Sequence, residues 1–208
     1  MDRHPPQARE LLAAVTYVGR LDRGRHLRGF FACPYFGGLR PAEALGLRKQ
    51  DCHLPATGWG RLILAKSKPQ TNKKWTDSGA AHDDRGLKHR AEGEGRPVPV
   101  PPELVAILRE HIEEFGVHED GRLCRGSRGG VISIGTYCEA WKAARTFALT
   151  PEQQISPLAA RPYDLRHAAR GSVPLAQRGC CRSRCGRAGR ARSGRAAPGL
   201  CQVHRWRR

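Results

Sequence analysis

The sequence predicts a mainly helical α+β domain with a small antiparallel sheet and an irregular tail, on three observations. Apolar residues recur at helical spacing in several stretches, two short strand-like runs lie between those stretches, and the composition changes abruptly near Arg170. Helices followed by a small sheet and then by further helices are typical of the α+β class. We therefore expect a folded domain over residues 1–169 and a disordered tail over residues 170–208.

The N-terminal part of the chain predicts three helices. Residues 7–18 carry apolar side chains at helical spacing after a Pro-Pro start. Residues 27–36 form a second apolar run, but Pro34 lies inside it, so this helix is expected to kink or to end early. After a Gly-Gly break, Pro41 stands at a tolerated first-turn position of a third helix, and Arg40 would then lie at its N-terminus.

Two strands and two further helices are predicted next. Residues 61–65 predict a strand, and residues 96–100 predict another whose prolines confine it to a sheet edge. The polar stretch between them predicts a long hairpin or an insertion, with a mobile tip. Helices are expected over residues 102–115, with Gly116 ending the first of them, and after Ser133.

Three of the tryptophans are expected to serve packing. Trp59, Trp75 and Trp141 are more typical of packing residues than of platforms for stacking bases. Tyr137 and Phe147 lie on the same predicted helix as Trp141.

The chain is strongly basic, and its basic residues are unevenly placed. The formal charge is +18, from 37 Lys+Arg and 19 Asp+Glu. Residues 170–208 hold 11 Arg, no Lys and no acidic residue, which leaves +7 for residues 1–169. Such a tail binds nucleic-acid phosphates by releasing counterions. No apolar run approaches the length of a membrane span and no signal core follows Met1, so we expect a cytoplasmic protein without membrane contact.

Two short motifs lie on the predicted domain. Residues 38–48 read G-L-R-P-A-E-A-L-G-L-R, and residues 162–167 read P-Y-D-L-R-H. Together they resemble the catalytic domain of the tyrosine recombinase (phage integrase) family, whose first box is of the type T/A-G-L-R-x-x-E-x-x-x-L and whose second is H-x-L-R-H. The order of the motifs, their separation and the hairpin between them carry the resemblance, which covers about residues 5–169.

The resemblance implies roles for individual residues. Arg40 and Arg166 correspond to the two box arginines, which bind the scissile phosphate as substrate-binding and catalytic residues. Two planar guanidinium groups suit this task, because each donates a fork of hydrogen bonds to the oxygens that gain charge during phosphoryl transfer. Lys88 fits the catalytic lysine of the family's hairpin, which precedes an R-x-V-P strand, and Lys66 and Lys68 are alternatives to it.

Three further positions of the boxes complete the candidate site. Glu43 corresponds to the acid that buttresses the first arginine, and His167 follows the second arginine as it does in the family. Tyr163 stands where the second box normally begins with His; a phenol can still hydrogen-bond a phosphate, but proton transfer would suffer. Each residue also has an ordinary structural explanation, such as an ion pair between Arg40 and Glu43 or a packing role for His167.

The reaction that the resemblance implies is site-specific recombination or integration of double-stranded DNA by a mobile element. In the family, a tyrosine hydroxyl attacks phosphorus and forms a 3′-phosphotyrosine while a lysine or histidine protonates the departing 5′ oxygen. No metal or cofactor is therefore expected. The family acts in tetrameric synaptic complexes that exchange C-terminal segments, and it usually carries a helical core-binding domain before the catalytic domain; this sequence is expected to lack that domain, because Met1 falls almost at the start of the resemblance.

The tail departs from the family pattern. Residues 170–208 contain no tyrosine and no third box. A one-nucleotide shift of codons that can encode residues 199–206 gives V-Y-A-K-C-I-D, and the same shift over residues 185–192 gives V-A-E-R-A-G-H, which restores both elements in order. We interpret the tail as out-of-frame sequence after a break near Arg170, and the chain as a truncated, inactive catalytic domain. The alternative is a non-catalytic DNA-binding protein that retains the phosphate-binding arginines.

A zinc site in the tail is the remaining alternative. Cys181, Cys185, Cys201 and His204 superficially resemble a set of zinc ligands. Their spacing is loose, and almost no apolar residues surround them to pack around a metal. We therefore expect no metal site in this chain.

Overall fold

The computed structural model describes residues 6–19, 23–71, 81–87, 94–126, 129–157 and 159–169. All of them belong to one compact unit of the chain, Met1–Arg178. The second unit, Gly179–Arg208, lies outside the described residues, so the predicted division after residue 169 and the predicted tail stay predictions.

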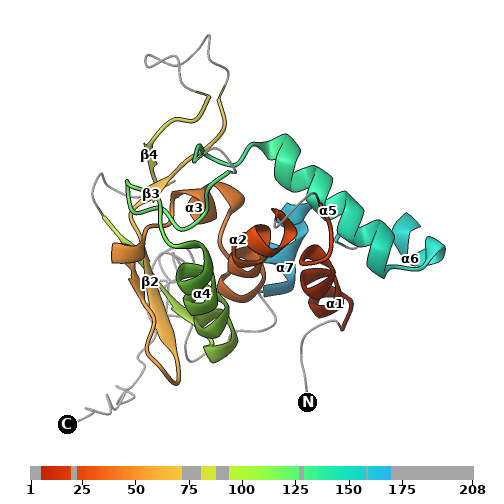
Figure 1. The fold of residues 1–208 in the computed structure, drawn as a ribbon, viewed down its shortest axis with the longest axis horizontal. Coiled ribbons are helices and arrows are strands. Elements are labelled where there is room, and N and C mark those ends of the chain that lie inside the picture. Colours follow the sequence, from red (N-terminus) through yellow and green to blue (C-terminus); the bar gives the residue numbers. More distant parts are fainter. Residues whose placement is uncertain are drawn as a thin grey trace, which may run out of the picture. The chain divides into compact units, whose positions relative to one another are not determined.

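Helices predominate in the described structure, and a small antiparallel sheet lies beside them (Figure 1), which confirms the predicted α+β class. The helices are α1 (Pro6–Val15), α2 (Arg23–Gly37), α3 (Pro41–Gly46), α4 (Pro102–Phe115), α5 (Ile134–Ala148), α6 (Pro151–Ile155) and α7 (Leu165–Ala169), with 3-10 turns η1 (Lys49–Asp51) and η3 (Pro162–Asp164). The strands are β1 (Cys52–His53), β2 (Gly60–Leu64), β3 (Lys66–Ser67), β4 (Arg85–Gly86) and β5 (Arg96–Val100). None of the described helices is long and apolar enough to cross a membrane.

α2 is the central helix of the unit, and it corrects one prediction. It continues through Pro34 to Gly37, so the early end predicted at the proline is wrong. The helix contacts α1, α3, α4 and α7, and residues 30–36 are all buried. The free energy gained by burying these side chains outweighs the cost of the one backbone hydrogen bond that Pro34 cannot donate. The N–H of Gly38 closes the last turn by donating to the carbonyl of Pro34 at 3.1 Å, and the φ of +64° at Gly38 then turns the chain out of the helix.

α1 and the start of α2 approach each other closely. α1 ends at Val15, before the predicted end at Val18, because the amides that follow bond to carbonyls three residues back in a tight turn. Val18 is buried all the same. A Cβ at Gly24 would overlap the carbonyl oxygens of Val15 and Val18, so glycine is required where the chain turns into α2.

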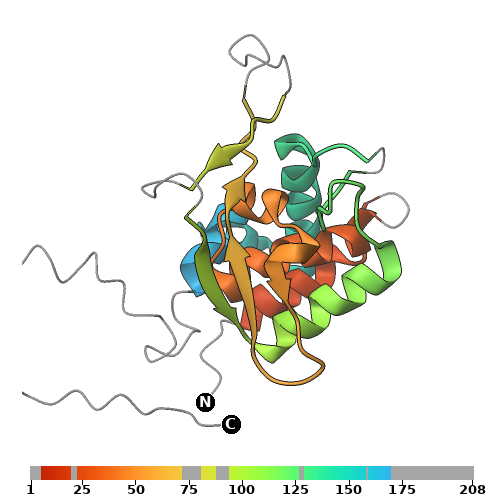
Figure 2. The same ribbon diagram turned by 90° about the vertical axis from the view of Figure 1, so that its left-hand side faces the viewer.

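The sheet has three strands in the order β1-β2-β5, and neighbouring strands are antiparallel (Figure 2). β2 lies in the middle with Leu62 and Leu64 buried, and among the described strands β5 pairs with β2 alone, with Val98 opposite Leu62. The prediction of an edge strand is therefore confirmed. β3 and β4 pair separately as an antiparallel hairpin, as predicted, and its expected tip at residues 72–80 lies outside the described residues.

The last two predicted helices are present as α4 and α5. Gly116 ends α4 with a φ of +68°. The hydroxyl of Ser133 caps α5 by accepting the N–H of Thr136 at 3.2 Å. Tyr137 is buried on α5, where its ring lies 4.9 Å from that of Phe30 and so joins this helix to α2.

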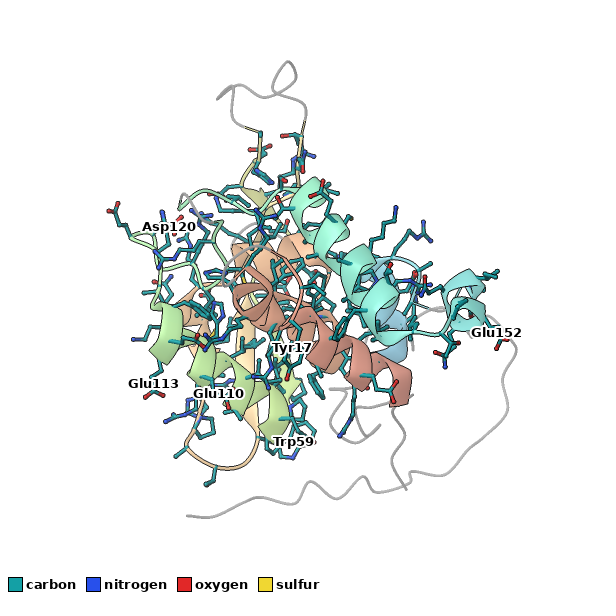
Figure 3. The ribbon with its side chains drawn as sticks, turned by 45° about the vertical axis from the view of Figure 1, so that its right-hand side comes forward. Tyr17, Trp59, Glu110, Glu113, Asp120 and Glu152 are labelled. Carbon is teal, nitrogen blue, oxygen red and sulfur yellow. The ribbon has the colours of Figure 1, made fainter. Side chains whose placement is uncertain are left out.

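The packing role predicted for the tryptophans holds for Trp141, which is buried, and not for Trp59, which is exposed. Phe147 is 68% exposed because it does not share the i, i+4 face of Trp141; it stacks instead on the exposed ring of Tyr17, with centroids 6.2 Å apart. Trp59 is 41% exposed, because it lies in the turn between β1 and β2, beyond the helices (Figure 3). Trp75 lies outside the described residues.

His26 on α2 makes the stability of this fold sensitive to acid. Burial, the neighbouring His111 ring and Arg125 lower the pKa of His26 from 6.5 to about 4. Its ring lies 5.0 Å from that of His111 and 4.8 Å from that of Phe115, so the protonated form gains no counter-charge from these neighbours. The folded protein therefore binds this proton less readily than the unfolded chain does.

We expect the free energy of unfolding to fall as the pH is lowered from about 6.5 towards 4, and the contribution of His26 to be fully present above that window. The loss should be about 2 kcal/mol once partial exposure of the ring is allowed for. Urea denaturation across this pH range measures it. The variant His26→Gln should show a clearly flatter profile; an unchanged acid dependence in that variant would assign the effect to other groups.

Candidate functional site

The first candidate arginine stands at the start of α3. Arg40 is the N-terminal capping residue, with extended backbone angles, and Pro41 follows it at the first helical position. Glu43, one turn into the helix, accepts the backbone N–H of Arg40 through Oε2 at 2.8 Å. The local sequence thus folds as predicted: the proline fixes the first turn, and the acid satisfies a donor that the helix leaves unpaired.

Glu43 lies buried between two arginines from different elements. Its side chain is 3% exposed, and Oε1 accepts a hydrogen bond from Nη1 of Arg40 at 3.2 Å. Oε2 accepts a second bond from Nη2 of Arg96, the first residue of β5, at 2.8 Å. A buried carboxylate needs such partners, because leaving water is costly without them. The resemblance predicts the pairing with Arg40; sequence reasoning missed Arg96, although its place in the R-x-V-P strand was a signal.

The guanidinium of Arg40 keeps donors for another partner. Its side chain is 37% exposed. Nη1 is bonded to Glu43, whereas Nε and Nη2 have no hydrogen-bond partner among the described residues. One nitrogen of the guanidinium is therefore bonded to Glu43, and the other two can donate to a ligand. This arrangement suits a residue that binds an anion.

The second candidate arginine lies on α7. Nη1 of Arg166 is inaccessible to solvent and has no hydrogen-bond partner in the described structure. No carboxylate of the described residues lies within ion-pair distance of it. Since an arginine stays charged at any pH of interest, a cation here without a protein counter-charge favours an anionic ligand.

The fold carries both arginines on helices that contact α2. α3 follows the C-terminal end of α2 after the Gly-Gly break, and α7 packs along α2 (Figure 1). Tyr163 and His167 flank Arg166, with their rings 5.6 Å apart at a steep angle, and Tyr163 is 41% exposed. Tyr163 and His167 are thus exposed together at the protein surface, on either side of the partly buried Arg166.

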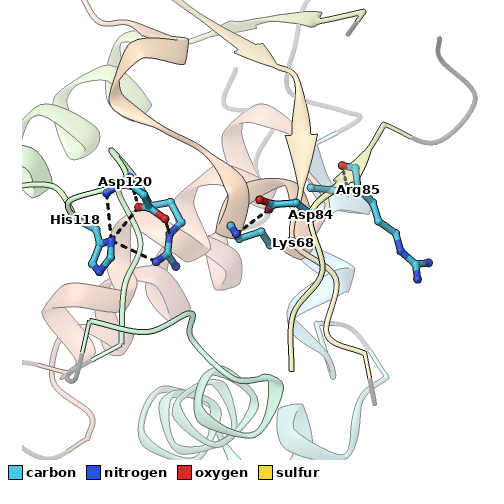
Figure 4. Close-up of polar contacts among 7 residues, drawn as sticks. Lys68, Asp84, Arg85, His118 and Asp120 are labelled. Atoms are coloured by element: carbon cyan, nitrogen blue, oxygen red, sulfur yellow. Dashed lines mark hydrogen bonds and ion pairs between the residues drawn. The ribbon is translucent and has the colours of Figure 1, made fainter. Parts of the chain in front are cut away.

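The candidate lysines differ in their surroundings. Lys88 lies outside the described residues. Lys68 is bound by its Nζ to Oδ1 of Asp84 at 2.7 Å and is only 14% exposed, and this hydrogen bond lowers the pKa of Asp84 (Figure 4). Lys66 on β3 is exposed. Lys68 is thus engaged by a carboxylate and Lys66 is exposed, and the choice of Lys88 as the catalytic lysine stays a prediction.

A second polar cluster lies in the loop after α4. Asp120 accepts hydrogen bonds from the Nε of Arg122 and from the ring of His118 (Figure 4). Burial alone would raise the pKa of Asp120, but these bonds outweigh burial and lower it to about 2. The cluster fixes the loop onto the carbonyl of Leu47, which accepts the N–H of Leu123. No group of three or more His, Cys, Asp and Glu within the described ranges could hold a metal ion.

The fold is shared with two solved structures that contain DNA. The Tn1549 transposon integrase in complex with circular intermediate DNA aligns with a TM-score of 0.59 and 15% identity, over 79% of this chain and 51% of that one. The XerH site-specific recombinase bound to its difH substrate aligns with a TM-score of 0.54 and 15% identity, over 80% of this chain and 41% of that one.

This chain therefore spans about half the length of these two proteins. The alignments show that it has the fold of tyrosine recombinase catalytic domains, so the fold implied by the motif resemblance is confirmed. No protein-family profile and no curated protein matches the sequence.

Proposed function

We propose that this chain binds double-stranded DNA at a backbone phosphate held between Arg40 and Arg166. The observation that carries the proposal is the partly buried guanidinium of Arg166, which has no carboxylate within ion-pair distance and no hydrogen-bond partner for its Nη1 among the described residues. Arg40 supports it, because its Nε and Nη2 likewise lack partners among those residues. Phosphate oxygens accept such donors in pairs and supply the counter-charge that Arg166 lacks.

The reaction class that fits this site is site-specific recombination, in which a DNA strand is broken and rejoined through a 3′-phosphotyrosine. The fold and the order of the two boxes support this class, which includes integrases, resolvases and the recombinases of mobile elements. The arginines would stabilise the charge on the phosphoryl oxygens in the transition state, and the hydroxyl of Tyr163 would add a hydrogen bond to the same phosphate. His167 lies beside that phenol, within reach of the same ligand.

Strand cleavage needs a tyrosine that this sequence does not supply after the second box. Residues 170–208 contain none. Tyr35 and Tyr137 are buried in the core, whereas Tyr17 and Tyr163 are exposed but lie before or within the second box, and the family's nucleophile follows that box. We therefore expect this chain to bind duplex DNA without forming a covalent link by itself, inside the cell and without a resident cofactor.

The experiment measures binding of the full chain to a fluorescent random-sequence duplex over a range of salt concentrations. Arg40→Ala and Arg166→Ala should each weaken binding about ten-fold and reduce the salt slope by about 1. Arg109→Ala removes the same charge from α4 and should change affinity about two-fold at most. Equal losses in all three variants would mean that the arginines contribute only net charge and would refute the phosphate site.

A suicide duplex that traps 3′-phosphotyrosine separates the two function classes. Salt-sensitive binding without a trapped complex supports a binding protein with the recombinase fold. A covalent complex would instead show that a tyrosine of this chain is the nucleophile, and the expected lack of cleavage would be wrong.

A further inference from the structure

The net charge around Glu43 depends on a third residue besides Arg40 and Arg166. An isolated pair of Arg40 and Glu43 would be neutral, and a neutral pair attracts a phosphate weakly. Arg96 changes the sum, because it donates to Oε2 of the same carboxylate at 2.8 Å. The three side chains together carry one net positive charge, shared around a carboxylate that is 3% exposed.

Arg96 also fixes the direction of the carboxylate. Oε2 of Glu43 is held from two sides, by Nη2 of Arg96 and by the backbone N–H of Arg40, both at 2.8 Å. With Oε2 fixed, Oε1 can face only one way, and it is Oε1 that bonds Nη1 of Arg40 at 3.2 Å. The orientation of the remaining Arg40 donors therefore depends on a residue from another element, which starts a sheet strand and is 28% exposed.

We infer that Arg96 is a positioning residue for DNA phosphate binding: it orients Arg40 through the carboxylate of Glu43. The inference rests on the proposed phosphate site. It assigns Arg96 no contact with DNA, so its effect on binding must pass through Arg40.

A double-mutant cycle on the full chain tests that dependence with the same fluorescent duplex. Arg96→Met should weaken binding about five-fold in the native background and about two-fold or less when Arg40 is already alanine. Arg96→Lys keeps the charge within reach of Glu43 and should recover most of the affinity. Arg61→Met removes the same charge from an exposed position of β2 and should leave affinity within about two-fold. A five-fold loss in both backgrounds would mean that Arg96 touches DNA directly and would overturn the inference.

The Nε–Hε resonance of Arg40 in the free protein, observed by NMR, separates this inference from the proposed function. In Arg96→Met it should shift and broaden, while the fold, followed by amide resonances of α5, is retained. If Arg40→Ala leaves DNA affinity unchanged, the proposed phosphate site fails, whereas the shifted resonance still supports positioning of Arg40 by Arg96. An unmoved resonance in a folded Arg96→Met protein would refute the positioning role whatever the DNA result.

Discussion

Replacing Trp141 by alanine is expected to lower the free energy of unfolding by about 4 kcal/mol, the largest effect of any change considered for this protein. Its side chain is 1% exposed, and its ring lies 5.1 Å from that of Phe31, so truncation leaves a cavity between α5 and α2. The indole Nε1 also donates to the carbonyl of Ala159 at 2.9 Å. Ala159 has a φ of +52°, a strained conformation for a residue with a side chain, directly before the second box.

Urea denaturation of three variants resolves these contributions. Trp141→Phe keeps most of the packing and loses the hydrogen bond, so it should cost about 1–2 kcal/mol. Adding Ala159→Gly to it should recover part of that loss, because glycine adopts this φ without strain. Trp59→Ala is the matched control. Because Trp59 is 41% exposed, its replacement should lower the free energy of unfolding by less than about 1 kcal/mol. Equal costs at positions 59 and 141 would contradict the packing described here.

Glu43→Gln is expected to destabilise the fold by about 2 kcal/mol, although it preserves the volume of the side chain. The change leaves Arg40 and Arg96 next to each other with no acid between them. Breaking a fully buried ion pair costs more, but these arginines are 37% and 28% exposed and can regain water. Thermal and urea denaturation at neutral pH measure the loss.

Two further variants assign that loss to charge. Glu139→Gln neutralises an exposed acid on α5 and should change the free energy of unfolding by less than about 0.5 kcal/mol. Arg96→Met combined with Glu43→Gln removes one of the two neighbouring cations and should be more stable than Glu43→Gln alone. If the double variant is less stable than the single one, Arg96 contributes packing rather than charge, and the electrostatic explanation fails.

Much of the fold could be predicted because its helices and strands carry local signals. Pro41 and Ser133 mark helix starts and Gly116 marks a helix end, and the alternating prolines of residues 96–100 mark an edge strand. The error at Pro34 has a different origin: whether a helix tolerates an internal proline depends on what surrounds it, and α2 is surrounded on nearly every side. Burial by distant elements cannot be read from a local pattern.

The candidate site was predictable in part. The two boxes point to Arg40, Glu43 and Arg166, and the pairing of the first two is present in the structure. Arg96 was missed because its partner is far away in the sequence and is reached only when β5 pairs with β2.

The edge strand β5 also limits how this protein can associate. Pro97 and Pro99 are two residues apart, so both missing N–H groups fall on the same side of the strand, away from the ladder with β2. A free strand edge with intact donors is a template on which a strand of another molecule can add. The outer edge of β5 has carbonyl acceptors but lacks the N–H donors of Pro97 and Pro99. Addition of a strand from another molecule is therefore blocked on this side of the three-stranded sheet.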